Sequence, residues 1–206
     1  MTTATTALAA AWFLVVSLAA APVAAQTRDV MPLMVLVDNM AGVPINVQDK
    51  ARRASSKIFR EIDVDIIWLD KSDVRLTNPA VLKSTIVVHV LPHDTNAHSK
   101  IAHEALGVAL PGTRFAWVFY DRIEALVPRY ADNDLSCRLG HVIAHEIGHL
   151  LLPTRAHSPT GIMMAALDGE RASQGALFFT HGQAREIRTK LGGDRRSTMA
   201  DPRSTN

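Results

Sequence analysis

The feature that most constrains this chain is the run of residues 145–149, which reads His-Glu-Ile-Gly-His inside an apolar stretch. Histidines spaced four residues apart project from one face of a helix, where both rings can bind a single zinc ion. Glu146 is offset from them by about 100° of helical rotation, so it can reach a metal-bound water rather than the metal. The pattern therefore predicts a helix that holds a metal and carries a general base.

The apolar residues around this motif favour the same helix. Six of them fall on the side opposite His145 when the segment is helical: Leu139, Ile143, Ala144, Ile147, Leu150 and Leu151. Asp134 or Ser136 is the expected N-cap. Pro153 is expected to end the helix, because the residue before a proline avoids helical backbone angles.

A catalytic zinc site needs a third protein ligand and an open position for water. We expect His157 to be this ligand, because the loop after the helix is long enough to bring it back under His149. His141 lies on the same helical face as His145, but about 12 Å of helix separates it from His149. We therefore expect His141 to line a cleft wall or face solvent.

These residues, followed by His157-Ser158 and Gly161-Ile162-Met163, resemble the metzincin clan of zinc endopeptidases and, within it, the matrixin branch. The resemblance implies an α+β fold: a mixed twisted sheet with an active-site helix, and a small C-terminal subdomain that ends in a helix. It also implies the roles of the site residues, which are His145, His149 and His157 as ligands of one catalytic zinc ion, Glu146 as general base, and Met163 as the methionine of the turn beneath the metal.

The chain departs from the family pattern H-E-x-x-H-x-x-G-x-x-H. Leu152 stands at the glycine position and Arg155 at the last histidine position, so the third histidine falls two residues late. In the related gluzincins the third ligand is a glutamate well beyond the second histidine. Glu170 is therefore the alternative third ligand.

The first 25 residues contain no charged side chain and carry an apolar run from Ala7 to Ala21, with small residues before Gln26. This pattern is typical of a secretory signal peptide over residues 1–25. It predicts a secreted protein, periplasmic or extracellular, without stable membrane association after cleavage. Residues 26–193 are expected to form one catalytic domain, and the polar residues 194–206 a disordered tail.

The net charge of +2 at pH 7 is too small to indicate nucleic-acid binding. The single cysteine, Cys137, excludes an intramolecular disulfide and is expected to be a buried small residue. The zinc-peptidase prediction adds a peptide or protein as the substrate and a monomer as the expected state.

Apolar runs predict strands at residues 30–37, 64–69, 85–91, 106–110 and 115–120, and spacing predicts further helices at 46–61, 122–127 and 182–191. Asn46 and Thr180 are the expected N-caps, and Gly192-Gly193 is expected to end the last helix.

Two segments between these elements carry functional hypotheses. Gly107, Val108, Ala109 and Leu110 are expected to form an edge strand, to which an extended substrate could add by analogy with the family. The histidine-rich stretch His89–His103 could hold the second, structural metal of matrixins, but its spacing matches no zinc signature and favours solvated loop histidines.

The sequence as a whole predicts a secreted zinc-dependent peptidase, in which Glu146 deprotonates a zinc-activated water. The two tyrosines, Tyr120 and Tyr130, do not follow the methionine turn, so zinc and backbone donors are expected to stabilise the transition state. A zinc amidase acting on cell-wall or small-molecule amides is an alternative. A non-proteolytic secreted metal-binding module is another, although such a module has no need for Glu146.

Overall fold

The computed structural model describes residues 29–93, 105–110, 112–127, 132–153, 157–165 and 177–199. Several residues singled out in the sequence lie outside these ranges: the signal peptide 1–25, His98, His103, Tyr130, Arg155 and Glu170. No helix of the described ranges is both long and apolar enough to span a bilayer.

The described strands form one five-stranded mixed sheet in the order β2-β1-β3-β5-β4. Their bounds are β1 Met31–Asn39, β2 Val64–Leu69, β3 Ile86–Leu91, β4 Gly107–Ala109 and β5 Phe115–Phe119. The first four strands in the order are parallel, and β4 pairs antiparallel with β5 at the edge. All five predicted strands are therefore confirmed, each with ends within two residues of the prediction.

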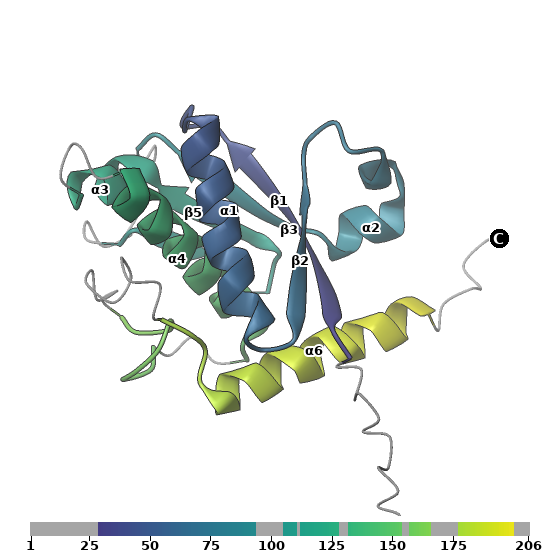
Figure 1. Cartoon of the computed structure of the whole chain (residues 1–206). Helices are drawn as coiled ribbons and strands as arrows, with labels where there is room; N and C mark the ends of the chain where they lie inside the picture. The colour runs from purple at the N-terminus through teal and green to yellow at the C-terminus, as the bar shows by residue number, and fades with distance from the viewer. Residues whose placement is uncertain are drawn as a thin grey trace, which may run out of the picture.

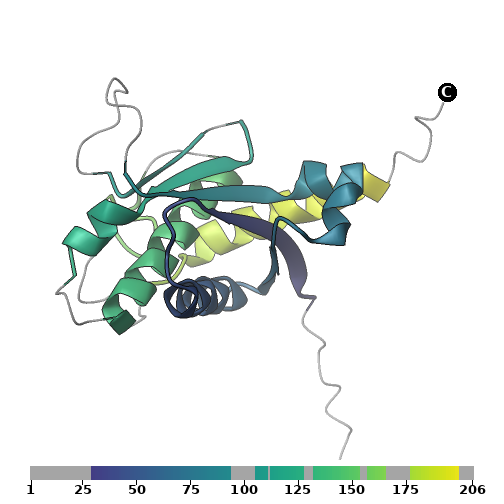
Figure 2. The same cartoon turned by 90° about the horizontal axis from the view of Figure 1, so that it is seen from above.

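Two long helices, α1 (Ile45–Arg60) and α4 (Asp132–Leu151), lie side by side on one face of the sheet (Figures 1 and 2). The sheet turns alternate apolar side chains toward them, because successive residues of a strand point to opposite faces. Leu33, Val35 and Val37 of β1 are buried in this way against the helices. The result is the expected α+β architecture with a mixed sheet.

Small residues bring α4 unusually close to α1. A Cβ on Gly140 of α4 would lie 2.6 Å from the carbonyl oxygen of Ala51 and 2.7 Å from Cβ of Ala54. The Ser55 hydroxyl, buried between the helices, donates to the Gly140 carbonyl at 2.8 Å. This contact fixes the helix that carries the H-E-x-x-H motif.

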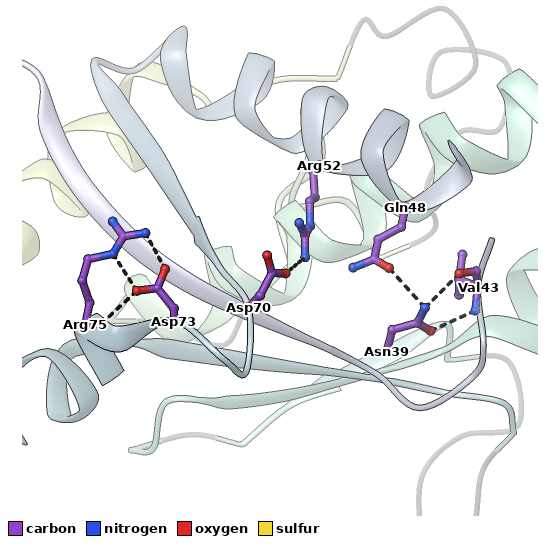
Figure 3. Close-up of polar contacts among 7 residues, drawn as sticks. All are labelled: Asn39, Val43, Gln48, Arg52, Asp70, Asp73 and Arg75. Atoms are coloured by element: carbon purple, nitrogen blue, oxygen red, sulfur yellow. Dashed lines mark hydrogen bonds and ion pairs between the residues drawn. The ribbon is translucent and has the colours of Figure 1, made fainter. Parts of the chain in front are cut away.

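The turn between β1 and α1 is organised by one amide side chain. Asn39 donates to the Val43 carbonyl and accepts from the Val43 N–H, both at 2.9 Å, and donates to Gln48 at 3.1 Å (Figure 3). The helix then begins at Ile45 with Pro44 at the N-cap. The expected cap Asn46 is therefore wrong: proline has a backbone φ already fixed near −54°, and the chain enters the helix there.

Two short helices between β2 and β3 were not predicted, η1 (Val74–Thr77) and α2 (Pro79–Ser84). Asp73 accepts a hydrogen bond from the Arg75 backbone N–H and pairs with its guanidinium at 2.6 Å (Figure 3). Asn78 caps α2 through the Ala80 N–H. Asn78 followed by proline is a recognisable start signal for a helix. Arg52 of α1 and Asp70, which follows β2, pair at 2.9 Å beside this region (Figure 3).

α3 (Tyr120–Ala125) confirms the predicted short helix after β5. α4 begins at Asp132, so Asp134 and Ser136 lie inside it and neither is the expected cap. The Ser136 side chain is buried.

The last helix, α6 (His181–Met199), crosses one end of the sheet and contacts β1 and α4 (Figure 1). Thr180 and Gln183 bond reciprocally through backbone N–H groups and side chains, at 3.3 and 2.9 Å, which confirms the Thr180 cap. The predicted end at Gly192-Gly193 is wrong, because neither glycine has the positive φ of a helix stop. Residues 194–199 of the expected tail are helical.

Candidate metal centre

The structure brings three histidines together at the end of α4. His145 and His149 lie on the helix, and His157 follows in the loop after it; one ring nitrogen from each lies within 4.8 Å of the others. The Nε2 atoms of His145 and His149 are 3.0 Å apart. Four ligands around zinc at 2.0–2.1 Å place neighbouring nitrogens about 3.3 Å apart. The donor set therefore fits a zinc ion, and it is the one such group among the described residues.

A backbone carbonyl fixes the orientation of the His145 ring. Nδ1 of His145 lies 2.7 Å from the Ile162 carbonyl oxygen, so Nδ1 carries the proton and Nε2 presents its lone pair to the cluster. Gly161 makes this turn possible: its φ is +80°, and a Cβ would lie 2.5 Å from the Phe178 carbonyl oxygen. The backbone of this turn therefore orients the His145 ring, in addition to the packing of the turn's side chains.

Met163 lies directly against the backbone of α4. It is fully buried, and a Cβ on Gly148 would lie 2.5 Å from its sulfur. Gly148 precedes His149, so the methionine packs under the segment that carries the helical histidines. The Met163 carbonyl accepts from the Ser158 N–H at 2.7 Å, and Gln183 of α6 donates to the Ser158 hydroxyl at 3.2 Å. These bonds tie the His157 loop to the turn and to α6.

The helical histidines are neutral at neutral pH. Burial lowers the pKa of His145, and burial together with the neighbouring His145 and His157 lowers the pKa of His149 to about 4. Metal ligands must be deprotonated. His145 and His149 are therefore in the protonation state that binds a metal.

Glu146 occupies an apolar environment beside this cluster. Its side chain is 4% exposed, and burial raises its pKa to about 8, although the backbone N–H of Ala109 partly offsets this. Its Oε2 has no hydrogen-bond partner in the part of the chain described. A carboxyl group with a pKa near neutrality suits both acceptance and delivery of a proton.

The strand that the sequence predicted at the edge of the sheet is present. Gly107, Val108 and Ala109 form β4, and Leu110 follows it. Its substrate-binding role stays a prediction. The Ala109 N–H is already engaged by Glu146, a contact that the sequence could not indicate because it involves a backbone group with no residue signature.

His141 is not where it was expected. It is 1% exposed rather than in a cleft wall or solvent, and its Nδ1 lies 2.6 Å from the Cys137 carbonyl oxygen. Helical rotation alone places it with His145, but α1 packs against α4 beside it: a Cβ on the neighbouring Gly140 would lie 2.6 Å from the Ala51 carbonyl oxygen. Cys137 itself is only half-buried, less than expected.

The histidine-rich stretch shows no metal cluster over its described part. His89 of β3 pairs with Asp38 of β1 at 3.2 Å and stacks on Phe115 and Trp117. Lys71 also reaches Asp38, at 2.6 Å. Burial raises the pKa of Asp38, but Lys71 and His89 outweigh it and hold the pKa below its usual value. His89 therefore contacts a carboxylate and two aromatic rings of neighbouring strands.

No protein-family model matches the chain, and no curated protein sequence matches it. Solved structures do match. One is a zinc-dependent peptidase from Methanocorpusculum labreanum, 17% identical, with a TM-score of 0.54 over 77% of this chain and 99% of that one. Another is archaemetzincin from Archaeoglobus fulgidus complexed with malonate, 14% identical, with a TM-score of 0.50 over 75% of this chain and 99% of that one. The chain has the metzincin-like fold of these structures.

Proposed function

We propose that this protein is a secreted zinc-dependent peptidase. The observation that carries the proposal is the convergence of His145, His149 and His157 next to a buried glutamate, Glu146, that has a raised pKa. Three imidazoles with a fourth position left for water are the ligand set of a catalytic rather than a structural zinc site. The metzincin-like fold supports the same assignment.

In this proposal Nε2 of His145, Nε2 of His149 and a ring nitrogen of His157 hold the zinc. Bound zinc supplies a Lewis acid that polarises the scissile carbonyl and lowers the pKa of water. The Ile162 carbonyl keeps the His145 ring in the tautomer that this requires. Met163 and Gly148 pack the floor of the site, and the Ser158 bonds hold the loop of His157.

Glu146 is the proposed general base. Its Oε2 accepts the proton of the attacking water and delivers it to the nitrogen of the leaving amine. That oxygen is available because no other described group bonds to it. The apolar surroundings raise the proton affinity of the carboxylate, which makes the same group a competent acid in the second step.

The proposed substrate is a peptide in extended conformation that adds to β4. The outward N–H and C=O groups of Gly107 and the C=O of Ala109 are the backbone groups it would pair with, since the Ala109 N–H is held by Glu146. Export through residues 1–25 and action as a monomer belong to the same proposal. Mass spectrometry of the exported protein should then show a chain that begins at Gln26.

Cleavage of a broad peptide library tests the reaction type. The wild type loaded with zinc should cleave peptides, and Glu146→Gln, which has the same size but cannot act as a base, should lose at least about a hundredfold in kcat. His181→Ala, an exposed histidine at the start of α6, serves as the control and should cleave like wild type. Turnover of simple amides without cleavage of any peptide would refute the peptidase assignment and favour the amidase.

A further inference from the structure

β4 touches Glu146 at two points. A Cβ on Gly107 would lie 2.8 Å from Cγ and 2.8 Å from Oε1 of Glu146, so the strand backbone lies directly against this side chain. Two residues later, the N–H of Ala109 donates a hydrogen bond to the Glu146 carboxylate. Since Oε2 has no partner within the described chain, Oε1 is the oxygen that Ala109 holds.

The pairing of β4 explains why this N–H is available. In an antiparallel pair, alternate residues direct their backbone groups toward the partner strand and away from it. Phe119 N donates to Leu106 O, and Leu110 N donates to Phe115 O, both at 2.9 Å. Gly107 and Ala109 therefore direct their N–H groups away from β5, toward the free edge of the sheet. Glu146, on helix α4, accepts a hydrogen bond from one of these edge donors, the Ala109 N–H.

β4 is also a firm support for such a contact. Val118 and Ala116, opposite Gly107 and Ala109 in the register, are fully buried, and α4 contacts both β4 and β5. A Cβ on Gly107 would also lie 2.8 Å from the Trp117 carbonyl oxygen, so this position of the strand has no room for a side chain. The position of the strand and that of the carboxylate are thus fixed together.

We propose that β4 is the positioning element for Glu146: the Ala109 N–H fixes Oε1, and the bare Cα of Gly107 leaves room for Cγ, so that Oε2 alone is left to exchange a proton. In their contacts with Glu146, both residues are positioning residues. The catalytic meaning of the inference rests on the proposed function, whereas the contact itself does not. The bond from the Ala109 N–H therefore holds Oε1 in place, and Oε2 is the oxygen that takes part in proton transfer.

Backbone hydrogen exchange, measured by NMR on the metal-free protein, tests the contact. The Ala109 amide should be protected in wild type although no strand pairs with it, and Glu146→Ala should speed its exchange roughly ten- to a hundredfold. Glu146→Gln should keep most of the protection, because its side-chain carbonyl still accepts. The Leu110 amide, which donates to Phe115, is the internal control and should not change.

Equal exchange of the Ala109 amide in wild type and Glu146→Ala would overturn the inference. An equal acceleration at Leu110 would overturn it as well, since Glu146 would then hold the strand rather than be held by it. This experiment needs neither metal nor substrate. Its result is therefore independent of whether the protein is a peptidase.

The catalytic consequence is tested by Ala109→Pro. Proline removes the donor to Glu146 but no ladder bond, because this N–H faces away from β5. We expect kcat to fall roughly a hundredfold while KM and zinc content stay near wild type. An unchanged kcat would refute the positioning role. A wild-type protein that cleaves no peptide would instead refute the proposed function, and the exchange result would still decide the contact.

Discussion

The close approach of α1 and α4 makes a quantitative prediction for Gly140→Ala. Alanine inside a helix normally stabilises it by about 1 kcal/mol relative to glycine. Here the added methyl would lie 2.6 Å from the Ala51 carbonyl oxygen and 2.7 Å from Cβ of Ala54. Neither atom belongs to a flexible side chain, so the helices must separate, and overpacking of this kind costs about 1–3 kcal/mol.

Separation also weakens the buried bond from Ser55 to the Gly140 carbonyl, which is 2.8 Å long. Losing such a bond costs about 1 kcal/mol. Together with the overpacking, and less the gain in helix propensity, the net loss in the free energy of unfolding is about 1–3 kcal/mol. For a domain of this size that corresponds to a fall of roughly 2–12 °C in Tm.

Thermal unfolding of the metal-free protein, followed by circular dichroism, measures this change. Gly193→Ala is the matched control, because a Cβ there meets nothing within 4 Å in α6. The control should be neutral or more stable by up to about 1 kcal/mol. If Gly140→Ala is as stable as Gly193→Ala, the close contact between the two helices is not real and the placement of the metal helix must be revised.

Two further predictions concern the site and its surroundings. Gly148→Ala should lower zinc affinity at a smaller cost in stability than Gly140→Ala. The reason is that the added methyl, 2.5 Å from the Met163 sulfur, displaces a flexible side chain under the histidines. A chelator competition that gives the wild-type zinc affinity would contradict this. His141→Asn should flatten the pH dependence of stability in the metal-free protein. Burial lowers the pKa of His141 below its usual 6.5, so the unfolded chain binds the proton more tightly, and wild type loses stability as the pH falls below about 6.5. Urea midpoints at pH 7.5 and 5.5 measure the effect, and an unchanged difference between them would refute the role of His141.

The elements that the sequence predicted well are those specified by local pattern. The strands are runs of Val and Ile whose burial shows in the sequence itself, and residues 145–149 place two histidines on one helical face by spacing alone. Thr180 with Gln183 forms a capping box that spans four residues. The sequence also indicated that His157 would return to the helix, because the loop before it is long enough to bring the chain back under His149.

The failures have a different origin. His141 lies at a favourable helical angle, but its burial depends on α1, which is distant in sequence. Gly192 and Gly193 end a helix only with a left-handed backbone, which nothing in the sequence requires here. The bond from Ala109 to Glu146 depends on the register of β4 against β5. Each of these is decided by tertiary packing rather than by local propensity.

The zinc content of the purified mature protein tests the central claim most directly. We predict about one zinc per chain in wild type, retained in Glu146→Ala and in the control His181→Ala, and lost or much weakened in His157→Ala. If His157→Ala binds zinc as tightly as wild type, His157 is not the third ligand and Glu170 becomes the next candidate. A wild-type protein that holds no zinc even when zinc is supplied would contradict the proposed function altogether.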